Sequence, residues 1–283
     1  MHGTKLIPRL ACAVLVVASI ATTARAQDDK EMAFSYGVDY TLATDYVWRG
    51  LNLSEYDGEG REDLNHQLSV YGAVDTEIGT FGGNVWFEWF AGQDELDPDA
   101  DGHLQEVDYT AYYGNTVGPV YGELGWILYT FPSTGGGNTT NEGYVSLSLD
   151  DSALWGTEEP ILSPWVAYYM DLDDFRHDSW IEVGVEHTFQ CAMIEGLSAT
   201  PSVVLGADHR YLTGTTTQLA NIVYGLGVTY DFGAALDVPE TYGSFAVTGF
   251  INFSQALTDD ERADGSPLLD DELWGGVTLS WAR

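Results

Sequence analysis

The fold of this chain is decided by the stretch Ile222-Val-Tyr-Gly-Leu-Gly-Val-Thr-Tyr-Asp-Phe232. Large apolar residues occupy every even position from Ile222 to Phe232, whereas the odd positions between them hold Val, Gly, Gly, Thr and Asp. A period of two places these two sets on opposite faces of a β-strand. The stretch therefore predicts a strand with one apolar face and one face of small or polar side chains.

The same alternation recurs along the chain. Twelve segments show it, at 33–48, 64–77, 81–91, 104–115, 119–131, 142–150, 161–171, 178–189, 200–211, 220–232, 242–254 and 272–282. Most of them exceed the ~5–6 residues typical of soluble strands and have the ~9–11 residues that a tilted strand needs to cross a bilayer. After Gln27 no apolar run approaches the ~20 residues of a membrane-spanning helix.

The connections between these segments are of two alternating kinds. One kind is mostly compact, as at 78–80 and 116–118, and the other is polar and often acidic, as at 92–103 and 255–271. Aromatic residues near the segment ends are typical of interfacial girdles, namely Trp48, Phe81, Trp89, Tyr129, Phe131, Trp180, Phe189, Tyr211, Phe232 and Trp281. These features predict an all-β chain that forms an antiparallel transmembrane β-barrel of about twelve strands, with short periplasmic turns and longer acidic extracellular loops. A secreted β-sandwich is the alternative.

The N-terminus has the three parts of a secretory signal peptide. A basic start with Lys5 and Arg9 precedes an apolar run, and Ala24-Arg25-Ala26 supplies a small-x-small cleavage site. We expect residues 1–26 to be cleaved and 27–283 to form a single outer-membrane barrel domain. The mature chain then keeps one cysteine, Cys191, which excludes an internal disulfide.

The charge balance restricts the partners. The chain has 44 acidic against 10 basic residues and a net charge of −34, so it lacks the basic surface that nucleic-acid binding requires. The expected partners are outer-membrane lipids and small cations or uncharged solutes.

The polar face of the segments predicts the lining of a pore. The predicted lining residues are Asp39, Asp75, Glu88, Asp108, Glu123, Glu182, Glu186, Asp208, Arg210 and Asp231. Carboxylates around a wet pore attract cations and repel anions. Because twelve strands lie between the ~8 of filled barrels and the ~16–18 of open porins, we expect a narrow, cation-preferring porin-like channel for passive diffusion. A plugged barrel that acts as a structural or surface-interaction protein is the alternative.

A motif in the first segment carries a family resemblance. Thr44-Asp45-Tyr46-Val47-Trp48-Arg49-Gly50-Leu51-Asn52-Leu53-Ser54-Glu55, with Asp45, Tyr46, Trp48, Arg49 and Gly50 as its main matches, resembles the start of the TorF family of porin-like outer-membrane proteins. Glu106-Val107-Asp108-Tyr109 resembles a later strand of that family. The resemblance implies an outer-membrane barrel with a porin-like role. From the residues alone, Arg49 either forms a structural ion pair or reaches inward carboxylates or a loop.

The sequence also contains a candidate metal site and a pair of residues that would suit an enzyme. Asp97, Asp99 and Asp101, with Gly102 after them and Asp108 in the twelfth position, match the spacing of calcium loops. A solvated acidic loop and a Ca²⁺ site both remain open, and no other cofactor is required. A lipid hydrolase is a remote alternative, because Ser179 and His209 become cross-strand neighbours on the lipid face if their strands pair about residue 194. No third orienting group accompanies them, so we expect no enzyme.

Overall fold

A computed structural model describes residues 33–54, 64–90, 104–132, 139–173, 178–214, 216–259 and 268–283. The twelve long strands are β1 (Ala33–Ala43), β4 (Asn65–Thr76), β5 (Gly79–Phe90), β6 (Leu104–Val117), β7 (Val120–Thr130), β8 (Thr139–Leu149), β9 (Trp165–Asp171), β10 (Ser179–Glu186), β12 (Leu197–His209), β13 (Thr217–Asp231), β14 (Ser244–Ala256) and β15 (Glu272–Ala282). The short elements are β2 (Val47–Trp48), β3 (Leu51–Asn52), β11 (Phe189–Gln190), helices α1 (Ser152–Trp155) and α2 (Phe232–Ala235), and a 3₁₀ turn at Glu240–Tyr242. Within the described ranges, none of the helices has the length and apolar character needed to cross a membrane.

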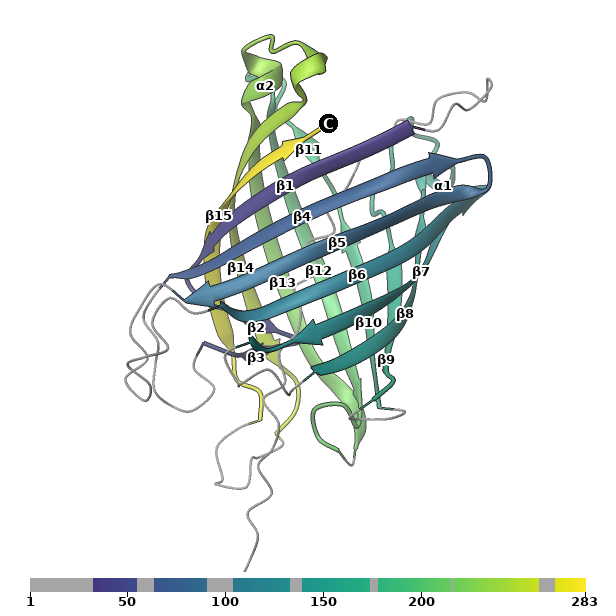
Figure 1. The fold of residues 1–283 in the computed structure, drawn as a ribbon. Coiled ribbons are helices and arrows are strands. Elements are labelled where there is room, and N and C mark those ends of the chain that lie inside the picture. Colours follow the sequence, from purple (N-terminus) through teal and green to yellow (C-terminus); the bar gives the residue numbers. More distant parts are fainter. Residues whose placement is uncertain are drawn as a thin grey trace, which may run out of the picture.

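The long strands form a closed antiparallel barrel, as predicted (Figure 1). Each strand pairs with its neighbours in sequence, and β1 pairs with β15, with Gly37 opposite Ala282. The backbones of Tyr36 and Arg283 extend this seam by exchanging two hydrogen bonds of 2.8 Å. A closed sheet leaves no unpaired strand edge, which is the condition for placing strands in lipid.

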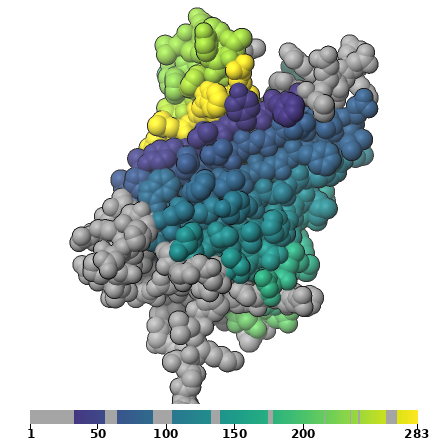
Figure 2. Space-filling model, in the orientation of Figure 1, coloured from purple at the N-terminus to yellow at the C-terminus, as the bar shows by residue number. Residues whose placement is uncertain are grey.

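The outer wall is apolar. On β13 the side chains of Tyr224, Leu226 and Val228 are exposed, and the residues between them face inward. Figure 2 shows the wall from outside, where β1, β4, β5, β6 and β7 lie side by side as oblique bands. The alternation of the sequence therefore sorts the side chains between the outside and the lumen as predicted.

The two ends of the barrel differ. One end of the barrel, called the turn end below, carries the tight β4–β5 and β6–β7 turns together with the longer connections that hold α1 and α2, and the opposite end is called the loop end (Figure 1). At the turn end, the Asp151 carboxylate accepts hydrogen bonds from the backbone amides of Ile161, Leu162 and Ser163 at 2.9–3.3 Å. These amides are thereby withdrawn from strand pairing, so β9 begins at Trp165 and the expected start at residue 161 is wrong.

The largest difference from the expected strands lies in the first segment. β1 ends at Ala43, and the chain then turns into a two-stranded hairpin, β2–β3, instead of continuing as a strand to residue 48. Arg49 and Gly50 connect its strands, with φ of 50° and 82°. Positive φ at both central residues is the mark of a type I′ turn, whose twist suits a tight hairpin. A Cβ at Gly50 would also lie 2.7 Å from Asn221 Nδ2.

The predicted aromatic girdle is only partly present. Phe81 and Phe189 are exposed on the outer wall, and the strand registers place Trp89 and Trp281 among the outward-facing residues as well. Five of the predicted girdle residues are instead buried in the barrel, namely Trp48, Tyr129, Phe131, Trp180 and Tyr211. Their assignment to the girdle is wrong, because the hairpin enters the lumen and supplies an apolar partner for aromatic rings on the inner face.

Candidate functional site in the lumen

The hairpin of residues 46–54 packs inside the barrel near the loop end (Figure 1). Tyr46, Trp48 and Leu51 belong to one buried cluster with side chains from the wall. The strands contribute Trp86, Ile127, Tyr129, Tyr144, Ala167, Tyr169, Trp180 and Ala220, and the loop-end connections contribute Phe131, Tyr211 and Leu269. The hairpin is further tied to its own base, since the Tyr46 amide donates to Ser54 Oγ at 2.8 Å. This half of the lumen is therefore a packed core instead of an open bore.

Arg49 at the tip of the hairpin forms a buried ion pair with Glu142 on β8. Its Nη1 and Nη2 donate to Oε1 and Oε2 of Glu142 at 2.9 and 3.1 Å. The two side chains are 4% and 0% exposed, and the Tyr129 hydroxyl donates to the same carboxylate at 2.8 Å. Such a bidentate geometry is the strong form of an arginine–carboxylate pair.

Four aromatic rings surround the Arg49 guanidinium. Its Cζ lies 4.5 Å from the ring centroids of Trp48 and Tyr211, 5.0 Å from that of Tyr169 and 5.5 Å from that of Trp180. All are within the ~6 Å range of cation–π attraction. The two interpretations of Arg49 coincide in this geometry, because its ion pair is buried and its partner Glu142 is an inward-facing carboxylate, and the pair also fixes the hairpin across the lumen.

A second polar cluster lies on β5 and β6, where the hairpin begins. The Tyr46 hydroxyl donates to Glu106 Oε2 at 3.1 Å, and its ring packs on Trp86 with centroids 5.4 Å apart. Glu88 lies opposite Glu106 and accepts from Asn65 Nδ2 at 3.0 Å. Asp108 is two residues along β6 and is 1% exposed. Three carboxyl groups are thus gathered in one buried part of the wall.

The strand registers place the other predicted acidic lining residues on the inward face, but they are spread over the barrel. These are Asp39, Asp75, Glu123, Glu182, Glu186, Asp208 and Asp231. Tyr121 and Tyr144 each donate to one oxygen of Glu123, at 2.9 and 2.6 Å. The indole of Trp180 donates to Glu182 at 3.0 Å. Inner-wall aromatic residues thus hold two of these carboxylates, Glu123 and Glu182, in place.

Asp208 and Arg210 have roles other than the predicted pore lining. The Asp208 carboxylate caps the turn after β12, accepting from the amides of Tyr211 and Leu212 at 2.6 and 3.1 Å. Arg210 lies beyond the end of β12 with φ of 63° and pairs with Asp178 at 3.1 Å. Its side chain is 41% exposed. Arg210 is therefore a residue of the loop-end rim, not of the wall, because the turn that Asp208 caps carries it out of the strand.

The remaining predicted sites have mixed outcomes. Asp97, Asp99 and Asp101 lie outside the described residues, so the calcium loop stays a prediction, and Asp108 belongs to the buried β6 cluster. β10 and β12 do pair about residue 194, with Trp180 opposite Asp208. However, Ser179 is buried, and Nδ1 of His209 lies 2.6 Å from the Thr217 hydroxyl. Ser179 shares the outward register of Ile181 and Val183, but its side chain is covered, so it is not exposed to lipid as the hydrolase hypothesis required.

The hairpin and the residues of the wall that it contacts were not predicted from the sequence. Glu142 was absent from the predicted lining, although it is the carboxylate that pairs with Arg49. The signal was present in the chain, because a two-residue Arg-Gly connection between Val47-Trp48 and Leu51-Asn52 is compatible with a short hairpin. Nothing in the sequence states which carboxylate the hairpin then meets.

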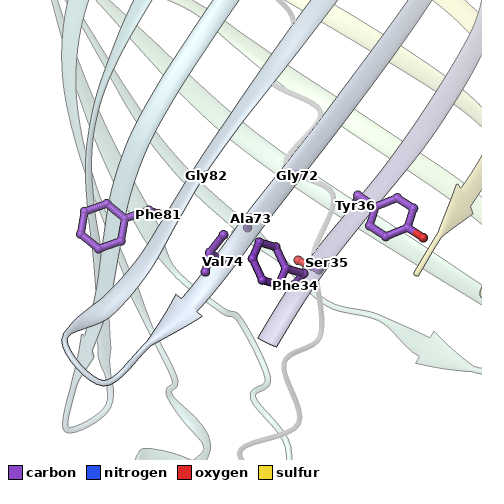
Figure 3. A pocket seen from close by; sticks show the side chains of 8 residues that line it. All are labelled: Phe34, Ser35, Tyr36, Gly72, Ala73, Val74, Phe81 and Gly82. Carbon is purple, nitrogen blue, oxygen red and sulfur yellow. The ribbon is translucent and has the colours of Figure 1, made fainter. Parts of the chain in front are cut away.

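A shallow groove of about 390 Å³ lies at the turn end of β1, β4 and β5 (Figure 3). The groove is bordered by four outward-facing side chains, those of Phe34, Tyr36, Val74 and Phe81, and Gly72 at its base has no side chain to fill it. A groove with an apolar rim on the outer wall is suited to hydrocarbon, so we do not assign it to the site in the lumen.

Comparisons with known proteins give distant structural likenesses. No family model and no curated protein match the chain. The NanC porin has a TM-score of 0.43 at 11% identity, with 88% of this chain and 99% of that chain covered. The β-domain of the Bordetella autotransporter BrkA gives 0.39 at 10%, covering 88% and 98%. Salmonella typhi OmpF gives 0.37 at 9%, covering 89% and 97%. These likenesses are too remote to assign a function.

Proposed function

We propose that this chain is an outer-membrane porin-like channel that passes small solutes by passive diffusion and favours cations. The observation that carries the proposal is the charge of the inner wall. Acidic side chains face inward on β1, β4, β5, β6, β7, β8, β9 and β10. The described ranges contain three basic residues, Arg49, Arg210 and Arg283, and the first two are ion-paired. Such a wall attracts cations and repels anions.

The location and the family follow as parts of the same proposal. A closed barrel with an apolar outer wall suits a bilayer, and the sequence features of residues 1–26 support export through a cleaved signal peptide. The Asp45–Gly50 motif supports membership of the TorF family. Acidic loops would raise the cation concentration at the mouth of the barrel.

The hairpin supports a narrow passage. It occupies the loop-end half of the lumen with aromatic side chains, of which Trp48 and Tyr46 are almost fully buried. The same observation favours one second candidate, a plugged barrel that acts as a structural or surface-interaction protein. The two candidates differ in conductance, because a plug that stays in place leaves no ion path.

The test is the reversal potential of single channels in planar bilayers under a salt gradient. We expect the wild type to favour cations, and the combined variant Glu123→Gln, Glu182→Gln, Glu186→Gln to lose much of that preference. Salt should weaken the attraction of cations by the charged mouth of the barrel, because this attraction is screened beyond ~10 Å at 0.1 M salt. Attraction between a permeating cation and a nearby wall carboxylate is screened less, so part of the wild-type cation preference should persist at high salt. Anion preference would contradict the proposal.

A matched control separates the lumen from the overall charge. Glu158, Glu159 and Glu195 are exposed in turn-end connections, and changing all three to Gln removes the same charge outside the wall. We expect this control to keep the wild-type selectivity. If both triple variants behave alike, the wall carboxylates do not set the selectivity, and if no variant conducts, the plugged barrel is the better description.

A further inference from the structure

The acidic cluster of Glu88, Glu106 and Asp108 has a geometry that the channel proposal does not explain. Glu88 and Glu106 lie directly opposite each other on β5 and β6, where Cβ atoms are about 4.5–5.5 Å apart. Asp108 is the next inward-facing residue on β6, about 7 Å along the strand. Each of the three residues is 1% exposed. The carboxyl groups therefore share one buried part of the inner wall.

Three oxygen atoms of this cluster have no hydrogen-bond donor among the described residues. They are Oε1 of Glu106 and both Oδ1 and Oδ2 of Asp108. By contrast, Glu106 Oε2 accepts from the Tyr46 hydroxyl at 3.1 Å. A buried carboxylate without a hydrogen-bond donor strongly destabilises the folded state. The Glu106 and Asp108 side chains lie within hydrogen-bonding distance of each other, but they can form that bond only if one of them holds a proton. The ionised cluster therefore needs a positive group.

The surroundings of Asp108 favour an organic cation. Its direct neighbours across the two strand pairs are Trp86 on β5 and Tyr129 on β7, and both rings are buried. Aromatic faces attract a cation and accommodate its aliphatic part. The same lumen already binds the Arg49 guanidinium in this way, through the Glu142 carboxylate and aromatic rings.

The number of open acceptors points to one chemical group. A primary ammonium has three N–H donors and no acceptor, which matches the three oxygens that have no donor when Glu106 and Asp108 are both ionised. A metal ion fits less well, because within the described ranges no group of three or more Asp, Glu, His or Cys side chains has the geometry to hold one. A guanidinium, with five donors in a rigid fork, has more donors than the cluster has open acceptors.

We propose that Glu106 and Asp108, with Glu88 beside them, bind the primary ammonium group of a small solute in the lumen. Tyr46 covers the cluster from the hairpin, with its ring on Trp86 and its hydroxyl on Glu106, so binding requires Tyr46 to move aside. The inference rests on the proposed function in naming amines as a class of permeating cation, but the binding itself can be measured without conduction.

The first experiment is calorimetric titration of the full-length mature barrel, folded in detergent, with ethylammonium chloride at pH 7. We expect saturable binding. Tetramethylammonium has the same charge but no N–H donor, and K⁺ has neither donors nor an aliphatic part, so both should bind at least tenfold more weakly. Equal affinity for K⁺ would overturn the assignment in favour of an inorganic cation. Absence of ethylammonium binding would overturn it too, and would indicate that the carboxyl groups share a proton.

Variants then locate the site. Asp108→Asn should lower ethylammonium affinity at least tenfold, because it removes one acceptor and the negative charge between the rings. Glu123→Gln is the matched control, since Glu123 faces the same lumen about six residues further along the sheet, ~20 Å away, and both of its oxygens have donors. We expect this control to bind ethylammonium within twofold of the wild type. Equal loss in both variants would mean that the lumen attracts amines only by its overall charge.

The outcomes remain interpretable if a variant fails to fold. Glu106→Gln is the second variant and should also lose at least tenfold in affinity, while the ligand series on the wild type needs no substitution at all. A barrel that binds ethylammonium but conducts no ions keeps this inference and contradicts the channel. A cation-selective channel that does not bind ethylammonium contradicts this inference alone.

Discussion

For a single residue such as Arg49, burial determines how much an ion pair contributes to stability. Arg49 and Arg210 each pair with one carboxylate at about the same distance, 2.9 Å to Glu142 and 3.1 Å to Asp178. The first pair is buried among aromatic rings, whereas the second is open to solvent on the Arg210 side. Breaking a buried pair leaves an uncompensated charge, whereas an exposed pair is replaced by water at little cost.

We therefore predict different effects of two arginine substitutions. Arg49→Ala should lower the free energy of unfolding by about 3–5 kcal/mol, since Glu142 then remains buried without its cation. Arg210→Ala should lower it by about 0–1 kcal/mol. Urea unfolding of the barrel in lipid vesicles, followed by tryptophan fluorescence, measures both. Similar small losses in the two variants would show that the Arg49 pair does not hold the hairpin.

At the scale of elements, connections shape the strands that they join. The turn between β8 and β9 is organised by Asp151, which accepts from the Trp155 indole at 2.7 Å and from three backbone amides. Burial by itself would raise the pKa of Asp151, but these donors together bring its pKa below the usual value. In the same way, the Arg49-Gly50 turn allows the chain after β1 to form a hairpin that enters the lumen.

The lowered pKa of Asp151 predicts a pH-dependent contribution to stability. A group whose pKa is lower in the folded state stabilises above its unfolded pKa, near 3.9 for Asp, and loses this effect as pH falls through the folded pKa. Asp151→Asn should therefore be less stable than the wild type at pH 7 and pH 5, and the difference should shrink below pH 4.

Urea midpoints at each pH measure this difference, with Glu158→Gln as the control because Glu158 is exposed in the same turn. The control should follow the wild type at every pH. A difference between Asp151→Asn and the wild type that stays constant from pH 7 to below pH 4 would exclude ionisation of Asp151 as its cause.

At the scale of the whole molecule, closure of the sheet determines how the protein resists unfolding. β1 and β15 come from opposite ends of the described chain and pair over seven registered positions from Gly37 to Ala43. Because every long strand is hydrogen-bonded to a neighbour on both sides, the barrel has no free strand edge at which detergent could start to separate the strands. The aromatic cluster inside the lumen joins the hairpin to the walls and adds to this resistance.

Closure predicts a change of mobility on heating. Unboiled samples in detergent should migrate differently from boiled samples on a gel, and the protein should fractionate with outer membranes. Arg49→Ala should keep the mobility difference but lose it at a lower temperature, because the barrel still closes while its interior is weakened. Equal mobility together with a soluble periplasmic location would support a secreted β-sandwich.

The strands and the direction in which their side chains point follow from the order of residues along the chain. A period of two needs no tertiary information, because neighbouring side chains on a strand always point to opposite sides. For this reason the twelve strands, their order and the inward register of residues such as Glu88 and Glu123 were predictable. The predicted alternation of compact and long connections holds only in part, because the turn-end connections at 150–164, 187–196 and 232–243 are longer than the loop-end connections at 131–138 and 210–216.

What fills the lumen depends on contacts that form only in the folded barrel. Trp48, Tyr129 and Trp180 lie near strand ends, where an aromatic ring is equally suited to a membrane interface or to a packed interior. Their burial depends on the hairpin entering the barrel, and the pairing of Arg49 with Glu142 joins residues 93 positions apart. Periodicity along a strand carries no information about contacts across a closed barrel, so this part of the site could emerge only once the sheet had closed around the hairpin.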